Sequence, residues 1–438
     1  MTPPPGTLGL PLIGETLSFF RDPNFASQRH QQYGDLFKTR LLGKPTIFLR
    51  GPDALHFVLT NENKYFVVSW PPSVKALLGP LSLALQSGQV HSQRRKLLVQ
   101  AFQPRALASY IPTMEAIGDR YTQRWLQQGT LTWYPELRDY TLDIACKLFV
   151  GLDNGSQSKL GHLFETWCSG LFSLPLRLPW TAFGKAWKAR EQLLAEIERL
   201  IQARKEQLEG GEDTPEDALS LMLLATDEDG QRLSTAELKD QVLLLLFAGH
   251  ETLTSAVTNF CLLLAQHPDV MNKARAEQAA FMSEPLTLDL LKQMPYLDQV
   301  TKEVLRFLPP VGGGFRDVLE DCHYGGYDIP KGWAVLYGIN TTHADAAVYT
   351  HADRFDPDRF SPERAEDKPK PFSHVPYGGG MRECLGKAFA QLELKLFTVT
   401  LLRNYDWTLL PGQNLAMTTA PTPHPKDGLK VTFQRYQR

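Results

Sequence analysis

The chain alternates apolar and polar positions near its two ends and follows a helical spacing through most of its middle. Between residues 33 and 57, two alternating segments flank the turn Gly43-Lys44-Pro45, which predicts a β-hairpin. A second β region is predicted over 322–340, and the segment near 405–435 is again strand-like and rich in Pro and Gly. Strands are therefore expected toward the two ends of the chain.

Apolar residues spaced three and four apart predict a series of helices between these β regions. The expected helices cover 90–110, 111–128, 136–151, 185–208, 234–266, 287–307 and 385–403. The Gly- and Asp-rich stretch 209–230 predicts an exposed loop region. This pattern is typical of a mostly helical α+β protein, and the lack of a repeat or linker predicts a single domain over 1–438.

The helix expected over 234–266 carries both a start signal and a stop signal. Ser234-Thr-Ala-Glu237 is a capping-box pattern, and His267-Pro268 ends the helix. Its apolar stretch 242–265 would suit a membrane span, but Glu251 at the middle is costly in a bilayer and no second span exists to pair with it. The segment is therefore predicted to be a buried core helix.

Small and polar residues interrupt the middle of this helix. Ala248 and Gly249 would let a ligand approach the backbone closely, and Glu251 and Thr252 add a carboxylate and a hydroxyl nearby. Thr252 can donate a hydrogen bond back to the carbonyl of Ala248. An acid–alcohol pair beside a bound oxygen can relay protons. The alternative is that the two side chains only satisfy each other in the core.

Composition narrows the possible function classes. A net charge of -2 with 21% charged residues argues against a nucleic-acid-binding protein. The five cysteines are odd in number and contain no Cys-x-x-Cys pair, which argues against a disulfide framework or a zinc site and favours a reducing, cytoplasmic location. The segment Met1–Gly9 has neither a basic start nor an apolar run, so we expect a soluble protein without a membrane span.

Cys384 lies in the glycine-rich stretch Tyr377-Gly-Gly-Gly-Met-Arg-Glu-Cys-Leu-Gly386, just before the last predicted helix. Such a turn can present one thiolate that is shielded by backbone N–H groups. A thiolate of this kind can bind a metal centre, or it can serve as the nucleophile of a Cys-His hydrolase. The turn by itself leaves both interpretations open.

Two further motifs, taken with this turn, make the pattern specific. Glu303-Val-Leu-Arg306 places a carboxylate and a guanidinium one helical turn apart, and Phe355-Asp-Pro-Asp-Arg359-Phe360 supplies another arginine in a loop. In this order and spacing the motifs resemble those of the cytochrome P450 haem-thiolate monooxygenases, across essentially the whole chain. The resemblance implies the cytochrome P450 fold, with a helix-rich core around haem and small β-sheets near the two chain ends.

The resemblance also implies residue roles. Cys384 would be the axial ligand of the haem iron, and Gly380 and Gly386 would let the backbone pass close to the porphyrin. Tyr377 would form an aromatic wall, although phenylalanine is usual there. The remaining roles would be propionate binding by His91, Arg95, Arg316 and Arg382, a buried ion network of Glu303, Arg306 and Arg359, and an oxygen groove of Ala248, Gly249, Glu251 and Thr252.

Family membership would imply haem b and O₂ as cofactors, with electrons ultimately from NAD(P)H through a separate partner. Basic residues on the two helices that flank the thiolate side in this family would suit an acidic ferredoxin or flavodoxin; they are Arg94, Lys96, Lys387 and Lys395. The protein is expected to act as a monomer. A haem isomerase, a peroxygenase and a non-catalytic haem- or lipid-binding protein are the alternatives.

The substrate-facing regions resemble those of the retinoic-acid hydroxylase branch, and in particular a cyanobacterial member of it. These regions are Trp70-Pro-Pro-Ser-Val74, Phe172-Ser-Leu-Pro175 and Pro309-Pro-Val-Gly-Gly-Gly-Phe315. The resemblance implies a long, apolar, carboxylated substrate such as retinoic acid, with Lys75 as a candidate partner for the carboxylate. The expected substrate-contacting residues are Trp70, Phe172, Phe183, Val311 and Gly312.

Overall fold

The computed structural model describes residues 2–211, 216–282, 284–418 and 422–437. The chain forms two compact units. Unit 1 contains residues 1–69 and 302–384, and unit 2 contains residues 70–301 and 385–438. Each unit therefore combines segments that are far apart in the sequence, and each is described separately.

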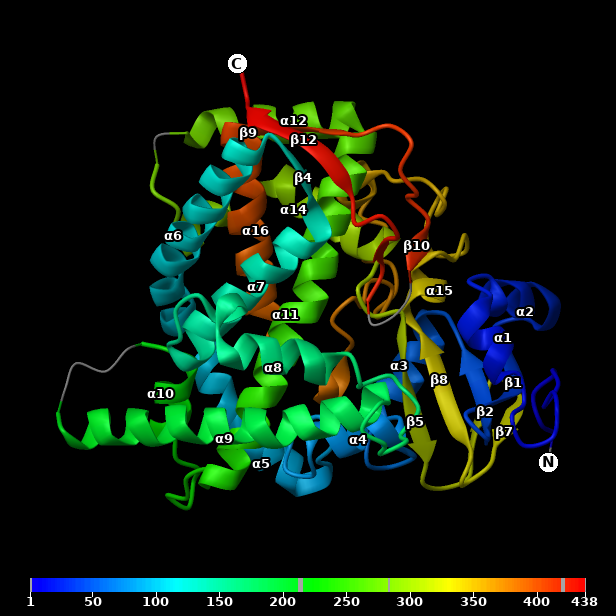
Figure 1. Ribbon diagram of the computed structural model, residues 1–438. Helices are drawn as coiled ribbons and strands as arrows, with labels where there is room; N and C mark the ends of the chain where they lie inside the picture. The colour runs from blue at the N-terminus through cyan, green and yellow to red at the C-terminus, as the bar shows by residue number, and fades with distance from the viewer. Residues whose placement is uncertain (1, 212–215, 283, 419–421, 438) are drawn as a thin grey trace. The chain divides into compact units, whose positions relative to one another are not determined.

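Unit 1 is built on a five-stranded mixed sheet (Figure 1). Its strands, in spatial order, are β1 (Leu36–Leu41), β2 (Lys44–Leu49), β8 (Ala334–Gly338), β5 (Gly313–Val318) and β3 (Phe66–Ser69). The β1–β2 pair confirms the predicted N-terminal hairpin. Figure 1 shows the yellow strands β5 and β8 beside the blue strands β1 and β2. Of the second predicted β region, 322–340, strand β8 joins this sheet, whereas β5 lies before that region.

Short helices cover this sheet. They are α1 (Thr16–Arg21), α2 (Phe25–Tyr33), α3 (Pro52–Thr60) and α15 (Ile339–His343), with a small hairpin of β6 (Cys322–Tyr324) and β7 (Tyr327–Ile329). Helix α3 begins with Pro52, which suits the first helical turn because its missing N–H would have no partner there. Leu55 and Val58 on α3 pack with Ile47 and Val335 in the main core of the unit.

Unit 2 is a helical body with small sheets. Its helices are α4 (Pro72–Leu78), α5 (Gly88–Leu98), α6 (Pro104–Gln128), α7 (Trp133–Val150), α8 (Lys159–Cys168), α9 (Ala182–Glu209), α10 (Ala218–Leu224), α11 (Thr235–Gln266), α12 (Pro268–Gln278), α13 (Leu288–Leu291) and α16 (Lys387–Asn404). Helix α14 (Pro295–Phe307) crosses the boundary between the units. The sheets comprise β4 (Thr130–Thr132), β12 (Lys430–Arg435) and β9 (Tyr405–Leu409), and β10 (Met417–Thr418) with β11 (His424–Pro425).

Helix α11 runs through the core of unit 2 and confirms the predicted boundaries. The Ser234 hydroxyl accepts a hydrogen bond from the backbone N–H of Glu237, and the Glu237 carboxylate accepts one from the backbone N–H of Ser234, so the capping box is complete. Both ends were readable from sequence because a capping box and a following proline act on neighbouring residues. Helices α7, α9 and α16 pack against α11.

Several predicted boundaries were wrong. The expected break between 110 and 111 does not exist: a 3₁₀ turn ends at Phe102, and α6 starts at Pro104 and continues through Pro112. Pro104 suits the helix start, whereas tertiary packing tolerates Pro112 inside the helix. The stretch 209–230 contains α10, apart from 212–215, which lie outside the described residues. The predicted helix 287–307 is divided into α13 and α14.

The described residues include no helix that is both long enough and apolar enough to cross a membrane.

Candidate active site

The cysteine turn of unit 1 is closed by backbone hydrogen bonds. The N–H of Cys384 donates to the carbonyl oxygen of Tyr377 over 2.9 Å, and the N–H of Gly378 donates to that of Val375 over 3.0 Å. Cys384 is exposed, whereas Cys146, Cys168 and Cys261 are buried. Burial raises the pKa of the Tyr377 hydroxyl, and the nearby Cys384 adds to this shift. The turn therefore presents one accessible sulfur from a fixed backbone.

The two glycines predicted to lie against a porphyrin differ in their backbone conformation and in the room that the chain leaves for a Cβ atom. Gly380 has φ +64°, and a Cβ there would lie 2.2 Å from the carbonyl oxygen of Leu59 at the end of α3. Gly386 has φ -88°, and a Cβ there would come no closer than 3.9 Å to Phe102. Gly380 is thus required by the fold itself, because it permits both the positive φ and the close approach of α3.

Two of the arginines predicted to bind propionates share a single carboxylate in unit 1. Nε of Arg316 on β5 lies 3.0 Å from Oε2 of Glu62, and Nε of Arg382 lies 3.0 Å from Oε1 of the same residue. Arg316 and Glu62 are buried. Sequence reasoning missed Glu62, because no local pattern connects it to arginines 254 and 320 residues away.

Glu303, Arg306 and Arg359 form one buried cluster in unit 1. Arg306 contacts the Glu303 carboxylate through Nε at 2.6 Å and Nη2 at 2.8 Å, and Nε of Arg359 lies 3.1 Å from it. Arg306 also donates to the carbonyl oxygens of His343 and Ala352. The predicted trio is therefore brought together, and it ties α14 to the loops on either side of residue 350.

The same cluster includes a carboxylate that was not predicted. Nη1 of Arg359 lies 2.8 Å from Oε2 of Glu366, and Nη1 also donates to the carbonyl oxygen of Thr350 over 2.8 Å. The Glu366 pKa is lowered: partial burial would raise it, but hydrogen bonds from Arg364 and Arg359 outweigh that effect. Glu366 could not be found from sequence because acidic residues are frequent in such exposed loops.

In unit 2, the middle of α11 has one face that is not fully buried. From Asp240 to Leu264 every residue is buried except Leu244, Phe247, Ala248, Gly249 and Thr252, and of these five Ala248 is the exposed one. Leu244, Ala248 and Thr252 are spaced four apart and lie on one face of the helix. Thr252 Oγ1 donates to the Ala248 carbonyl oxygen over 2.8 Å, as predicted. The uncovered part of this helix thus carries small side chains at Ala248, Gly249 and Thr252, beside the larger Leu244 and Phe247.

Glu251 and its neighbour Thr252 bind different partners. Its side chain is 1% exposed, and its Oε1 lies 2.9 Å from Nη1 of Arg138 on α7. Nη2 of Arg138 lies 2.5 Å from the carboxylate of Glu165 on α8, whose side chain is 42% exposed. The interpretation in which Glu251 and Thr252 only satisfy each other is therefore wrong, because Arg138 supplies the partner.

The buried imidazole of His250 also belongs to this cluster. Its Nδ1 lies 2.8 Å from the hydroxyl of Thr141, and its Nε2 lies 3.6 Å from Glu165 and 3.7 Å from Glu251. Burial would raise the pKa of Glu165, but the hydrogen bond with His250 and the charge of Arg138 lower it overall. The cluster links the partly exposed Glu165 to the buried Glu251.

The other two predicted propionate ligands lie on α5 of unit 2. His91 and Arg95 are one helical turn apart, with His91 buried and Arg95 half-buried. His91 is thus placed inside the unit rather than on its surface.

The predicted substrate residues are divided between the units. Trp70 is half-buried and donates from its indole N–H to the carbonyl oxygen of Ala84 over 3.0 Å, while Phe183 is buried beside Trp187. Phe172 and Lys75 of unit 2 are exposed. Val311 and Gly312, in unit 1, are also exposed. The apolar residues with exposed surface remain candidates for substrate contacts.

The basic residues expected to attract an electron donor are mostly paired. Arg94 lies 2.6 Å from Glu237, Lys96 lies 2.6 Å from Glu228, and Lys395 lies 2.6 Å from Asp298. The Lys395 side chain is only 13% exposed. The basic face of unit 2 is thus weaker than the sequence suggested, because tertiary structure brings carboxylates next to the cations.

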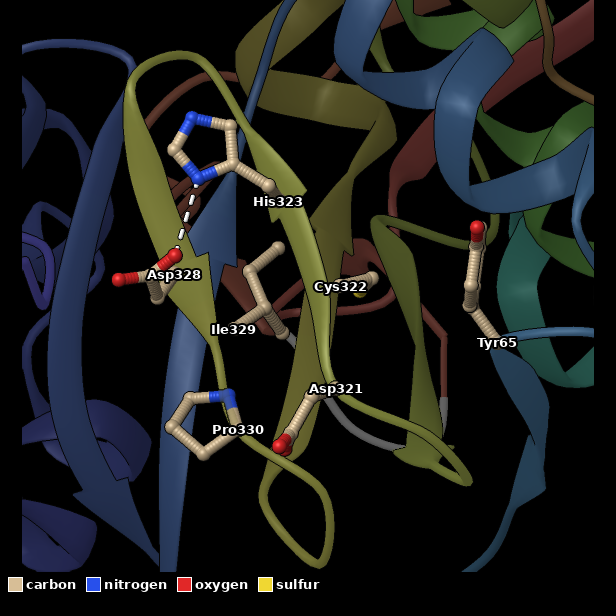
Figure 2. A pocket seen from close by; sticks show the side chains of 7 residues that line it. All are labelled: Tyr65, Asp321, Cys322, His323, Asp328, Ile329 and Pro330. Carbon is tan, nitrogen blue, oxygen red and sulfur yellow. Dashed lines mark hydrogen bonds and ion pairs between the residues drawn. The ribbon is translucent and has the colours of Figure 1, made fainter. Parts of the chain in front are cut away.

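A cavity of about 360 Å³ lies beside the β6–β7 hairpin, and no predicted site residue lines it. Figure 2 shows His323 joined to Asp328 across this hairpin, at 3.0 Å, while Cys322 projects away from the pair. Adjacent residues on a strand face opposite sides, so Cys322 and His323 do not form a nucleophile–base pair. Among the described residues, no group of three or more His, Cys, Asp or Glu side chains is arranged to hold a metal ion.

These residues fit a haem group. Unit 1 supplies an exposed cysteine sulfur and two arginines, which are the donor types that bind haem iron and anionic propionates. In unit 2, taken by itself, Ala248, Gly249 and Thr252 form a part of α11 that is not fully buried. His323 of the β6–β7 hairpin pairs with Asp328 and faces away from Cys322, so this hairpin does not supply the Cys-His pair of a hydrolase.

Comparison with known proteins agrees with this fit. The family model for cytochrome P450 matches residues 3–433, so the chain belongs to the cytochrome P450 family of haem-thiolate monooxygenases. It is 52% identical over 429 residues to the putative cytochrome P450 120 of Synechocystis sp., covering 98% of this chain and 96% of the relative. It is 39% identical over 448 residues to cytochrome P450 26A1 of Gallus gallus, covering 98% and 90%.

A solved structure is similar over the whole chain. It is the retinoic-acid-bound cyanobacterial CYP120A1, with a TM-score of 0.94, 51% identity and 100% coverage of both chains. The predicted family, fold class and monooxygenase activity are therefore confirmed. Membership implies haem iron, O₂, a source of electrons and a lipophilic substrate.

Proposed function

We propose that this cytochrome P450 hydroxylates a retinoid such as retinoic acid. The observation that carries the proposal is the similarity over the full chain to a cyanobacterial cytochrome P450 solved with retinoic acid bound. The 39% identity to cytochrome P450 26A1 adds support from a second relative. The substrate would be long and apolar, which suits the apolar side chains at Trp70, Phe172 and Val311.

Cys384 would hold the haem iron, and Arg316, Arg382, His91 and Arg95 would bind the propionates. When bound, the haem supplies the activation of O₂, and its thiolate ligand favours O–O cleavage. The protein itself would contribute binding, orientation and control of protons. The Glu303–Arg306–Arg359 cluster would fix the backbone of unit 1 that carries the cysteine turn.

Protons would reach the oxygen groove through unit 2. Thr252 would hold and pass a proton at its Oγ1, beside the small residues Ala248 and Gly249. Glu251 would be resupplied from solvent through the cluster with Arg138 and His250, because Glu165 at its far side is partly exposed.

Electrons would come one at a time from a separate acidic ferredoxin or flavodoxin that draws on NAD(P)H. The residues expected to attract an acidic donor are Arg94 and Lys96 on α5 and Lys387 and Lys395 on α16, although carboxylates lie next to Arg94, Lys96 and Lys395. The monomeric state, the single domain and the cytoplasmic location stay predictions.

Titration of the purified holoprotein with all-trans-retinoic acid, followed by the spin-state shift of the haem, tests the substrate. Retinoic acid is expected to shift the spectrum at lower concentration than a saturated fatty acid of similar length. The methyl ester tests the carboxylate: Lys75→Met should weaken binding of the acid but not of the ester, while Lys185→Met, at another exposed lysine of unit 2, should change neither.

Turnover tests the reaction. Hydroxylated product is expected with O₂, a ferredoxin and its NAD(P)H-dependent reductase. A spectral shift with fatty acids but not retinoids would overturn the retinoid assignment. Equal turnover with peroxide alone would favour a peroxygenase, and retinoid binding without product under either condition would favour a carrier.

A further inference from the structure

Glu62 is a buried carboxylate in the turn between α3 and β3. Its side chain is 1% exposed, and its two oxygens are divided between two arginines from distant parts of the chain. Oε2 accepts from Nε of Arg316, and Oε1 accepts from Nε of Arg382, each over 3.0 Å. One carboxylate therefore connects strand β5 with the cysteine turn.

The atoms used in these contacts define the direction of both guanidinium groups. A guanidinium is planar and carries its five N–H donors in a fixed arrangement. Because Glu62 occupies the Nε–H of each arginine, an anion held by these arginines must be bound through their terminal nitrogens. Fixing the Nε edge thus fixes the direction in which the terminal N–H groups point.

Arg316 is held by further contacts of the same unit. Its Nη1 donates to the carbonyl oxygen of Phe315 over 3.0 Å, and its guanidinium lies 5.1 Å from the ring centroid of Tyr337 on β8. The backbone of Arg382 is fixed as well, because its turn (Gly380–Arg382) packs against α3. Glu62 is the group common to both arginines.

We propose, on the basis of the propionate-binding roles proposed above for Arg316 and Arg382, that Glu62 is a positioning residue for the haem propionates. It aligns both guanidiniums through their Nε atoms, so that their terminal N–H groups are directed toward the propionates. Its fixed negative charge beside the propionates also favours the oxidised haem and thus lowers the reduction potential.

The holoprotein carrying Glu62→Gln tests this role. A glutamine has one acceptor oxygen and one NH₂ donor, so it can accept from only one of the two Nε–H groups. Haem transfer to apomyoglobin should become roughly tenfold faster, as expected for one lost charge-assisted hydrogen bond. The midpoint potential of the haem should rise, since a negative charge is removed. Glu320→Gln, which removes an exposed carboxylate paired with Lys331, should change neither quantity.

Glu62→Asp separates alignment from charge. The shorter side chain keeps the negative charge but cannot reach both arginines, so haem loss should accelerate with a smaller change in potential. It also provides a second variant if Glu62→Gln does not fold because the two buried arginines lack a negative charge beside them.

Double variants test whether Glu62 acts through the arginines. In the Arg316→Gln/Arg382→Gln background, adding Glu62→Gln should no longer accelerate haem loss. An equal acceleration in that background, or unchanged haem loss and potential in the folded single variants, would overturn the positioning role. A parent protein that takes up no haem would instead overturn the proposed function itself.

Discussion

Arg138 on α7 holds the carboxylate of Glu251 on α11, with Nη1 2.9 Å from Oε1. The two residues are 113 positions apart in the sequence, and the Glu251 side chain is almost fully buried. The hydroxyl of Thr252, the next residue, instead donates a hydrogen bond to the carbonyl oxygen of Ala248 in the preceding helical turn. The adjacent acid and alcohol thus have separate partners.

Removing Arg138 should leave a buried negative charge without its main partner. Arg138→Gln is therefore expected to lower the free energy of unfolding by about 3–5 kcal/mol. Urea denaturation of the holoprotein measures this loss. The matched control is Arg177→Gln, whose ion pair with Glu191 is 62% exposed on both sides and should contribute about 1 kcal/mol at most. Equal losses in the two variants would contradict the buried-pair explanation.

Replacing Thr252 should separate oxygen consumption from product formation. Thr252→Ala is expected to keep consuming O₂ while product per O₂ falls at least about tenfold, because a positioned proton donor is lost. Thr258→Ala is the control: its hydroxyl makes the same back-bond, to Thr254 over 2.7 Å, in the fully buried part of α11. Equal coupling in Thr252→Ala and the parent would show that the proton-relay role is wrong.

Cys384 should be the cysteine responsible for the thiolate-type optical spectrum. Cys384→Ala is expected to abolish this spectrum in the reduced carbon monoxide complex, together with monooxygenase activity, because the other side chains of the turn offer no thiolate. Cys322→Ala, at the other cysteine that is not fully buried, should leave the spectrum intact. A thiolate-type spectrum that persists in Cys384→Ala would refute the ligand assignment.

The two glycines of the cysteine turn should respond differently to a methyl group. Gly380→Ala would place Cβ 2.2 Å from the Leu59 carbonyl oxygen at a positive φ, so we expect a stability loss of at least about 1–2 kcal/mol and poor haem incorporation. Gly386→Ala has ordinary room within the chain. The ratio of haem to protein absorbance after purification compares them. A Gly386→Ala variant that loses haem without losing stability would indicate the porphyrin contact expected at that position. Equal stability losses in the two variants would contradict the difference between them.

His30 should make unit 1 sensitive to acid. Burial lowers its pKa from 6.5 to about 4, although the Gly34 carbonyl opposes this shift. Between these values the unfolded chain binds a proton that the folded chain does not, so stability is lost as the pH falls from 6.5 to 4, by up to about 3 kcal/mol.

Unfolding free energies at pH 7 and pH 4.5 measure this loss. His30→Phe should reduce it, since His30 packs edge-on to Phe37 and Phe48 and a phenyl ring suits that space. His56→Phe, at an exposed position, should leave the pH dependence unchanged. An identical acid sensitivity in His30→Phe would show that other groups account for it, among them the buried His343, whose pKa burial also lowers.

Local signals were sufficient for much of the fold. The capping box and the His267-Pro268 stop placed α11 correctly, and alternation around Gly43 placed the β1–β2 hairpin. Weaker signals failed: the helix boundary expected between 110 and 111 does not exist, and α10 was hidden in a loop-like composition.

The candidate site shows the same division. The motif residues Glu303, Arg306 and Arg359 were predicted together and are in contact. Their partner Glu366, like Glu62 and Arg138, was not predicted, because ordinary acidic and basic residues acquire such partners only when distant segments fold against each other.

The sequence by itself determined the cysteine turn, the long helix with its small and polar centre, and the resemblance to a haem-thiolate monooxygenase. These depend on spacing between near neighbours, which the chain fixes before it folds. Only the tertiary structure decided that Glu251 pairs with Arg138, that Glu62 joins Arg316 to Arg382, and that Gly380 lies against Leu59. Those contacts form only when residues far apart in the chain pack together. Burial then makes an unpaired charge costly and leaves room only for glycine where two segments meet closely.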